Sequence, residues 1–400
     1  MRRRDFLGAF AASTIPLRLQ AQRTSGRLKI TDIRNVNLRV IREAGSIEPA
    51  WNPGTPTKYT VGGGSVVEIR TGQGLTGIGP GVDESLLPAI KAQLLGKDPF
   101  DTEDHSARLR YYASGASYRG AANIDIALWD LLGKACGQPL YKLWGGGKDR
   151  VIPYASLIKL GTPEERAQLA SQLSKEGWQA IKLRLHHDNM TDDIRTVERV
   201  KEATGGRMTI MVDANQAQSS GNWQPGVLWD YRRAVETAKE LEKLGVYWLE
   251  EPLPRYDFAQ LAALNRAVGI PLAGGENNRG LHEFRQMCTD NVYDILQPEP
   301  LVMEGITGVR KVGVLAEAFG KRIVPHHGGG SVGTIATLHL VASWPHAPYW
   351  EMLHDPPVAS YEHRFAIFRD PPRVSKDGLM EVPQKPGLGV EIDPNLVLAQ

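Results

Sequence analysis

The fold is decided by the stretch Thr209-Ile210-Met211-Val212-Asp213-Ala214-Asn215. This stretch is apolar up to Val212 and becomes polar at Asp213 and Asn215. An apolar run without polar alternation is typical of a strand that is buried on both faces, as in a parallel sheet. We therefore predict a central strand that delivers Asp213 and Asn215 at its carboxyl end.

Two similar runs follow, Tyr247-Trp248-Leu249-Glu250-Glu251-Pro252 and Pro271-Leu272-Ala273-Gly274-Gly275-Glu276. Each run also ends in a carboxylate, so three successive strands place Asp213, Glu250 and Glu276 at one edge. Three carboxylates that converge would repel one another unless a divalent cation lay between them. The sequence therefore predicts a metal ion at the centre of the protein.

From Val151 onward the sequence alternates between strands and helices. Amphipathic stretches at 163–175, 192–203, 231–244 and 304–319 separate the candidate strands. Eight parallel strands with intervening helices favour a (β/α) barrel over an open sheet, with the active groups at the carboxyl ends of the strands. The predicted strands are 151–157, 180–185, 209–215, 247–250, 272–276, 293–297, 322–326 and 349–352.

The segment 27–148 lacks this alternation and reads as an α+β domain. It begins with an alternating strand at 28–40, followed by an expected loop at 43–64 and a hairpin formed by 65–70 and 74–79. Its clearest helix spans 121–135. The barrel is then expected at 149–354, and the proline-rich segment 355–400 is expected to return to the first domain.

The charge of the chain argues against some partners. The formal net charge is +2, and residues 1–21 contain four Arg and one Asp, which leaves −1 for the remainder. Nothing in this balance favours nucleic acid or an anionic membrane. We expect a small-molecule substrate and a homo-oligomer.

The N-terminus contains Arg3-Arg4-Asp5-Phe6-Leu7-Gly8 followed by a short, mildly apolar stretch. Paired arginines in this position resemble a twin-arginine export signal, here residues 1–21. The apolar stretch is too short to anchor the chain in a bilayer. We therefore predict a periplasmic or secreted protein without a membrane association beyond this signal.

The polar residues at the strand ends resemble the enolase superfamily, and most closely its mandelate racemase subgroup. The helix of that family before the barrel is similar to Ala122-Asn123-Ile124-Asp125-Ile126-Ala127-Leu128-Trp129-Asp130-Leu131-Leu132-Gly133-Lys134. The resemblance implies a modified TIM-type barrel under an α+β capping domain. The strand-end residues that carry it are Lys182, Arg184, Asp213, Asn215, Glu250, Glu276, Glu299, His326 and Glu351.

By this resemblance, Asp213, Glu250 and Glu276 match the three magnesium ligands of the family. Their oxygen atoms suit Mg²⁺, a hard cation that prefers such ligands. Glu251 is expected to point away, because side chains alternate along a strand. Lys182 matches the first lysine of a Lys-x-Lys pair and is expected to polarise the substrate carboxylate.

Two residues depart from the family pattern. Arg184 stands where the second lysine commonly acts as a base, and an arginine does not lose its proton at neutral pH. One face of the substrate is therefore expected to lack its usual base, and Arg184 to bind a hydroxyl or a second carboxylate instead. Glu299 stands where the family has the aspartate partner of its catalytic histidine.

His326 resembles the histidine base of the family, and a histidine with a carboxylate partner can both accept and donate a proton. Its neighbour His327 is a competing candidate, because a register error of one residue would exchange the two. Glu351 matches a glutamate that donates a hydrogen bond to the enolate. That role requires a protonated acid, and the alternative is an ion pair.

Two loops are expected to determine the substrate specificity. The family closes its site with a loop of the capping domain, which maps onto 43–64 and would bring Trp51, Lys58 and Tyr59 to a ligand. The surplus of residues at 216–229 includes Trp223 and follows a ligand-bearing strand, so it is expected to form a lid or a subunit contact. Asn215 and His327 are further candidates for substrate binding.

The resulting functional prediction is a Mg²⁺-dependent acid-sugar dehydratase. A base removes the proton next to the carboxylate, the enediolate is stabilised by Mg²⁺ and Lys182, and the β-hydroxyl leaves with a proton from His326. With catalytic groups on one side, syn elimination of an aldonate or aldarate to a 2-keto-3-deoxy acid is the simplest version. The alternatives are a racemase or epimerase, a cycloisomerase, or a carboxylate-binding protein whose catalytic pair has degraded.

Overall fold

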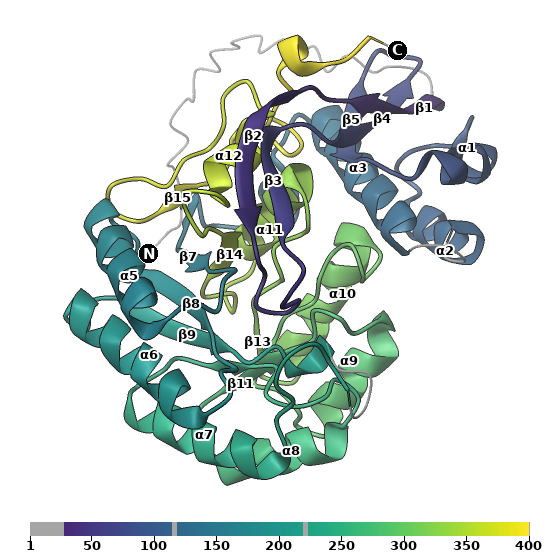
Figure 1. Ribbon diagram of the computed structural model, residues 1–400. Coiled ribbons are helices and arrows are strands. Elements are labelled where there is room, and N and C mark those ends of the chain that lie inside the picture. The colour runs from purple at the N-terminus through teal and green to yellow at the C-terminus, as the bar shows by residue number, and fades with distance from the viewer. Residues whose placement is uncertain (1–27, 114–117, 219–222, 400) are drawn as a thin grey trace, which may run out of the picture.

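The computed structural model describes residues 28–113, 118–218 and 223–399 (Figure 1). The predicted export signal at 1–21 lies outside the described residues and stays a prediction. Within the described part of the chain, no helix has both the length and the apolar character needed to cross a membrane.

The barrel domain contains one sheet of eight parallel strands, as the sequence predicts. Its strand order is β13-β12-β11-β10-β9-β8-β7-β14, so the sheet curls through all eight strands and has its two ends at β13 and β14. The strands are β7 (Pro153–Ser156), β8 (Ala180–Arg184), β9 (Thr209–Asp213), β10 (Leu249–Glu250), β11 (Leu272–Gly274), β12 (Ile295–Leu296), β13 (Arg322–Ile323) and β14 (Trp350–Leu353).

Helices cover the outer face of this sheet, and Figure 1 shows α5 to α9 as an arc around the lower half of the molecule. Some of them begin with ordinary capping signals: Thr162 forms a capping box with Glu165 at α5, and Asp230 caps α7. The helices are α5 (Pro163–Glu176), α6 (Met190–Thr204), α7 (Tyr231–Lys243), α8 (Phe258–Ala267), α9 (Gly280–Thr289), α10 (Gly305–Ala318) and α11 (Ser331–Ser343).

The capping domain is built on a three-stranded antiparallel sheet. Strand β4 lies between β1 and β5, and the helix α3 packs on this sheet with a continuous buried face. The elements are β1 (Ile30–Asn37), β4 (Ser65–Thr71), β5 (Thr76–Pro80), α1 (Leu87–Leu94), α2 (Thr102–Ala113) and α3 (Tyr118–Cys136).

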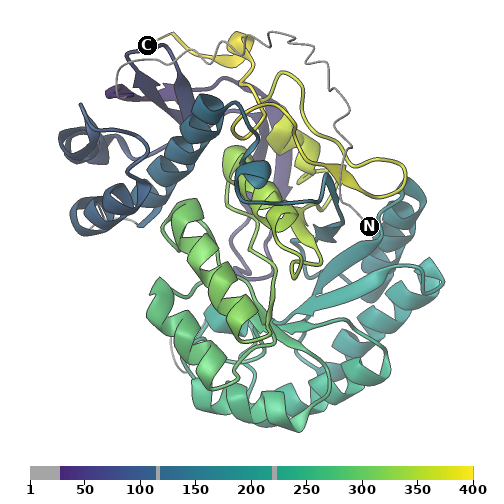
Figure 2. The ribbon, with the colours of Figure 1, turned by 180° about the vertical axis from the view of Figure 1, so that it is seen from behind.

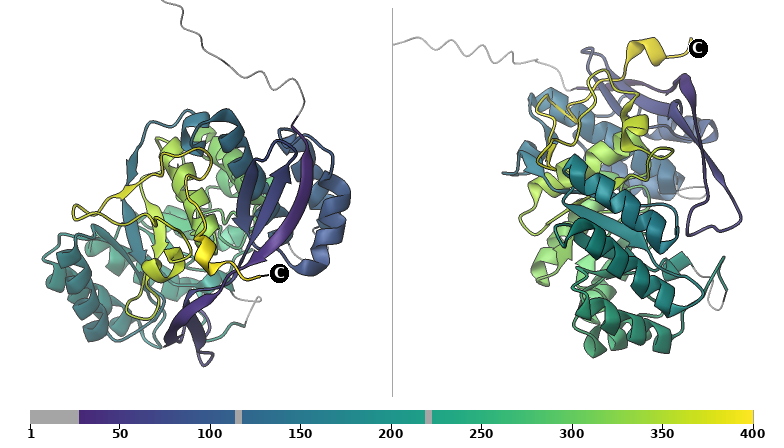
Figure 3. Two further views of the ribbon diagram at one scale, coloured as in Figure 1. Left: turned by 90° about the horizontal axis from the view of Figure 1, so that it is seen from above. Right: turned by 60° about the vertical axis from the view of Figure 1, so that its left-hand side comes forward.

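The expected loop at 43–64 is wrong in part, because β2 (Val40–Ile47) and β3 (Thr57–Gly62) form an antiparallel ribbon there. Most of the ribbon's residues are exposed on both faces, so its sequence lacks the alternation that marks a half-buried strand. The ribbon extends from the capping domain towards the barrel, and the right-hand view of Figure 3 shows it at one edge of the molecule.

The C-terminal segment lies against the capping domain. Leu38 forms a β-bridge with Val397, and Leu398 N donates to Asn37 O at 3.0 Å. The short strand β15 (Met380–Glu381) pairs with β6 (Arg150–Val151) at the start of the barrel. Figure 2 shows this segment in yellow beside the capping elements.

The helix α3 joins the three parts of the chain through side chains of its characteristic motif. Asp125 accepts hydrogen bonds from Thr307 N at 2.9 Å and Thr307 Oγ1 at 2.6 Å, in the first turn of α10. Asp130 accepts from Ile78 N and Leu388 N, each at 2.8 Å. The motif therefore secures the capping domain to a barrel helix and to the C-terminal segment.

Asp125 should make the stability of the protein depend on pH. Burial, only partly offset by the hydrogen bonds from Thr307, raises its pKa to about 7. The pKa of Asp125 is higher in the folded than in the unfolded protein, so the folded state binds its proton more tightly. The contribution of this proton to the free energy of unfolding is complete below about pH 4 and is lost as the pH rises to about 7. Relative to an Asp125→Asn variant, the wild type should lose at most about 1.4 kcal/mol of unfolding free energy per pH unit. Denaturant unfolding at several pH values measures this, and parallel curves would contradict it.

Candidate active site

The strand register brings the predicted polar residues to one edge of the sheet. Asp213 pairs with Arg184 of β8 on one side and with Glu250 of β10 on the other. In parallel strands, such pairing places these residues at the same level. The carboxyl ends of adjacent strands therefore deliver acids and bases side by side.

Asp213, Glu250 and Glu276 form a group that could hold a metal ion. One carboxylate oxygen from each lies within 4.8 Å of the others, and Asp213 and Glu250 are completely or almost completely buried. Buried carboxylates require compensating charge, and an all-oxygen set suits a hard divalent cation such as Mg²⁺. The donor set therefore fits the predicted metal.

Lys182 lies beside this group and is fully buried. Its Nζ is 2.6 Å from Glu250 Oε1 and 2.9 Å from Glu351 Oε1. Burial alone would lower the pKa of Lys182, but the carboxylates of Glu250 and Glu351 outweigh it, so the pKa is raised. Lys182 is therefore a fixed positive charge and not a base.

Arg184 is held by its own neighbours. The guanidinium pairs with Asp213, donates to Leu157 O at 2.7 Å and to Ser156 Oγ at 3.2 Å, and stacks on the Trp51 ring. Burial would lower its pKa, but the carboxylates of Asp213, Glu250, Glu351 and Glu276 together outweigh this effect and raise the pKa. Arg184 borders the cavity, but its donors are largely engaged. The prediction that it binds a second carboxylate gains no support from these contacts.

Glu251 is buried beside the metal group without belonging to it. Its carboxylate oxygens have no hydrogen-bond partner among the described residues. Burial, together with the charges of Glu276 and Asp213, raises its pKa well above the usual range. The protonated form of Glu251 is therefore favoured, and a protonated acid is a poor ligand for Mg²⁺.

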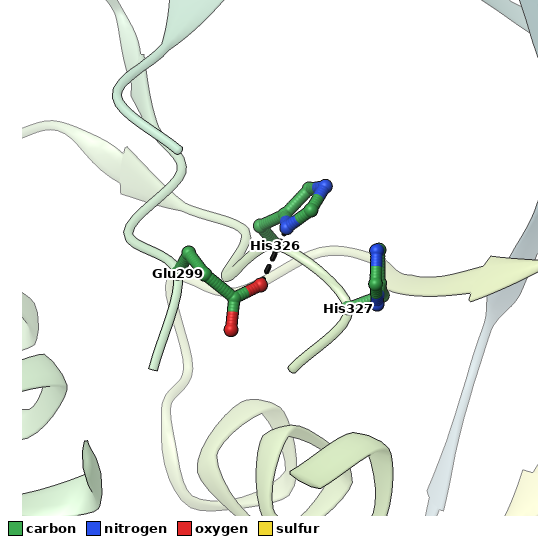
Figure 4. A group of neighbouring side chains, drawn as sticks. All are labelled: Glu299, His326 and His327. Carbon is green, nitrogen blue, oxygen red and sulfur yellow. Dashed lines mark hydrogen bonds and ion pairs between the residues drawn. The ribbon is translucent and has the colours of Figure 1, made fainter. Parts of the chain in front are cut away.

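His326 and Glu299 form a close pair (Figure 4). His326 Nδ1 lies 2.5 Å from Glu299 Oε2, which also accepts from Gly328 N at 3.1 Å. The other ring nitrogen, Nε2, lies 3.1 Å from Glu276 Oε2. Glu299 thus orients the ring so that Nε2 faces the metal group.

The charge of His326 is set by these carboxylates. Burial would lower its pKa, but Glu276, Glu351 and the hydrogen bond to Glu299 together raise it to about 10. The His326 pKa would fall if a bound cation offset the charge of Glu276, because Glu276 is the largest of the raising influences. The proton affinity of this histidine is therefore coupled to the charge on the metal group.

His327 lies in a different environment from His326. Its Nδ1 accepts from Gly329 N at 2.9 Å, and Figure 4 shows no contact between it and Glu299. Burial and the adjacent charge of His326 lower the pKa of His327 well below its usual value. Of the two histidines, only His326 has the carboxylate partner that a working base needs.

Glu351 forms an ion pair, so the expectation of a protonated acid is not supported. Burial would raise its pKa, but Lys182 and His326 lower the pKa below its usual range. The second oxygen, Oε2, lies 3.9 Å from His326 Nε2. Glu351 therefore connects the lysine and the histidine electrostatically.

A cavity of about 300 Å³ opens beside these groups. Of the residues predicted to touch a substrate, Trp51, Asn215 and His327 line it. Lys58 and Trp223 are exposed and do not line it, and Tyr59 packs against a cluster that includes the lining residue Leu353. The sequence interpretation missed several lining residues. These are Asn277, Leu301, Val302, Gly329 and Leu353. Asn277 could have been found, because it follows Glu276 directly.

A parallel barrel with a capping domain, and with a carboxylate group flanked by lysine and histidine at its strand ends, defines an enolase-type enzyme. Comparison with known proteins agrees with this class. The domain described as "Enolase C-terminal domain-like" matches residues 164–396, and "Mandelate racemase / muconate lactonizing enzyme, N-terminal domain" matches residues 42–145. The chain belongs to the mandelate racemase / muconate lactonizing enzyme family of the enolase superfamily.

Similar proteins include both lyases and isomerases by name. An arabinonate dehydratase of Saccharolobus solfataricus is 30% identical over 81% of this chain and 87% of its own length. A D-galactarolactone cycloisomerase of Agrobacterium fabrum is 29% identical over 82% of this chain and 88% of its own length. The crystal structure of D-glucarate dehydratase from Agrobacterium tumefaciens with magnesium has a TM-score of 0.80 at 28% identity, covering 94% of this chain and 100% of that one.

Proposed function

We propose that the protein is a Mg²⁺-dependent dehydratase of acid sugars. The observation that supports this most directly is the one-sided arrangement of the site. The His326–Glu299 pair faces the cavity, whereas the position of a second base holds Arg184, which is paired with Asp213. A single histidine that both accepts and donates a proton suits a syn elimination better than a two-base racemisation.

In this proposal His326 moves both protons. Its Nε2 accepts the proton from the carbon next to the substrate carboxylate, and Glu299 stabilises the resulting imidazolium through Nδ1. The same Nε2 then gives a proton to the leaving β-hydroxyl, so that a C–H bond and a C–O bond are broken and water leaves. The remaining enol becomes a 2-keto-3-deoxy acid.

The fixed charges around the cavity support the first of these steps. Lys182 keeps a positive charge beside Glu250, where it opposes the negative charge that develops on the substrate carboxylate. Asp213, Glu250 and Glu276 would hold Mg²⁺, which when bound polarises the carboxylate and makes the neighbouring proton more acidic. Trp51 and Leu353 add apolar surface to the lining of the cavity.

The test is a screen of the magnesium-loaded protein against mono- and diacid sugars in deuterated water. NMR would follow the formation of 2-keto acid and the loss of the α-proton signal. We expect a 2-keto acid from one stereochemical series. Exchange of the α-proton without loss of water would contradict the dehydratase and indicate an epimerase or racemase.

A cycloisomerase is the second candidate, because a relative that aligns over most of the chain is named as one. That chemistry also needs only one base next to a carboxylate. The same NMR screen, extended to sugar lactones and anhydro-sugar acids, separates the two proposals. A ring-opened or ring-closed isomer without water release would favour the cycloisomerase.

A further inference from the structure

Arg364 belongs to the short helix α12 (Tyr361–Phe365), outside the barrel strands. Its NH1 donates to Gly329 O at 2.6 Å, and Gly329 lines the catalytic cavity beside His327. Ser331 at the start of α11 donates in turn to the carbonyl of Arg364. The guanidinium is therefore held beside a residue of the cavity wall, and Arg364 is not itself one of the lining residues.

The charge of Arg364 has no acidic partner among the residues that the structure describes. The other cations of the site are paired, Lys182 with Glu250 and Glu351, and Arg184 with Asp213. Burial of the guanidinium lowers its pKa, and the nearby Tyr59 hydroxyl and Glu351 carboxylate offset this only in part. A partly buried cation without a counter-ion is unfavourable unless an anion completes the site.

Arg364 also lies close enough to the ribbon to interact with it electrostatically. It is among the charges that act on Tyr59 of the ribbon strand β3 and on His327. Tyr59 packs with Trp51 and Leu353, which line the cavity. An anion bound to Arg364 would thus lie between the ribbon and the loop that follows His327.

We propose that Arg364 binds a second carboxylate of the substrate, so that the preferred substrates are aldarates rather than aldonates. This inference rests on the proposed function, because it places the first carboxylate at the metal group. It assigns to Arg364 the role that the sequence suggested for Arg184. A guanidinium suits this role, since its planar donors match a carboxylate.

The test compares sugar acids that differ only at the far end, namely galactarate with galactonate and glucarate with gluconate. Binding to the magnesium-loaded protein is measured by calorimetry, and turnover by 2-keto acid formation. The variants are Arg364→Gln and Arg364→Lys. The matched control is Arg369→Gln, four residues C-terminal to α12, where the side chain is exposed and its guanidinium lies 3.4 Å from Glu391.

We expect the wild type to bind the aldarate of one pair more tightly than the aldonate. Arg364→Gln should weaken binding of that aldarate and raise its KM by about 10- to 100-fold, the range for a lost charge-assisted hydrogen bond. The aldonate should change by less than about 3-fold, and kcat should change little, because the contact is made equally in the ground and transition states. Arg364→Lys should lose less, and Arg369→Gln should behave as the wild type.

Three outcomes would overturn the inference. They are equal losses of binding for the aldarate and the aldonate of each pair in Arg364→Gln, a preference of the wild type for the aldonate, and no binding of either aldarate. If Arg364→Gln does not fold, the same selective loss in Arg364→Lys decides the question. Selective aldarate binding without turnover would refute the dehydratase and keep the role of Arg364. Turnover together with equal effects of Arg364→Gln on aldarate and aldonate would support the dehydratase and refute the role of Arg364.

Discussion

Replacing His326 with Asn should lower kcat on the confirmed substrate by about three orders of magnitude, within the range of general acid–base catalysis. Asn retains a donor near the position of Nδ1 and can keep the contact with Glu299. It has no group in place of Nε2, the nitrogen 3.1 Å from Glu276. Both α-proton exchange and 2-keto acid formation, measured by NMR in deuterated water, should therefore be lost together.

His327→Asn is the matched control for this variant. The two histidines are neighbours with rings 4.1 Å apart, but only His326 contacts Glu299. We expect His327→Asn to change KM more than kcat, because His327 lines the cavity without a carboxylate partner. Full turnover in His326→Asn together with loss in His327→Asn would show that the base is the other histidine.

Replacing Glu250 with Gln should weaken Mg²⁺ binding by at least about 100-fold and remove turnover at ordinary Mg²⁺ concentrations. Glu250 supplies one of the three grouped carboxylates and also accepts from Lys182 and from Gln297 Nε2, at 2.6 and 2.8 Å. An amide in its place removes an anionic ligand. It also leaves the positive charge of Lys182 with only the other nearby carboxylates to balance it. Calorimetric titration of the chelator-treated protein with Mg²⁺ measures the loss.

Glu251→Gln is the control, because the two residues are adjacent and both are buried. Glu251 has a raised pKa and lies outside the group, so an amide should substitute for its neutral acid with little change in Mg²⁺ affinity. If Glu251→Gln weakens Mg²⁺ binding as strongly as Glu250→Gln, the assignment of the ligands is wrong.

Removal of Mg²⁺ should abolish turnover and leave the fold intact. The internal cations Lys182 and Arg184 already pair with Glu250 and Asp213, so the carboxylates are not left without compensation. Added Mg²⁺ at 100 times its Kd should raise the unfolding free energy by about 2.7 kcal/mol. Circular dichroism and thermal unfolding with and without chelator check both statements, and loss of secondary structure on chelation would contradict the first.

The structure of the ribbon and the role of the C-terminal segment could not be predicted from sequence patterns. The ribbon β2–β3 has few buried positions, so no periodicity marks it, and only its contact with the barrel through Trp51 and Arg184 reveals its place. The sequence also did not identify Arg364 as a candidate site residue. It follows the last barrel strand, in a segment expected only to return to the first domain.

The sequence by itself determined the eight-stranded barrel and the order of acids and bases at its carboxyl edge. Buried strands are continuous apolar runs, and parallel strands deliver their ends to one edge, so local pattern is sufficient for both. The three-dimensional contacts alone show that Arg184 is engaged by Asp213, that Glu299 orients His326 and that Arg364 has no acidic partner among the described residues. These depend on distances between side chains far apart in the chain, and electrostatic interactions follow such distances and not sequence order.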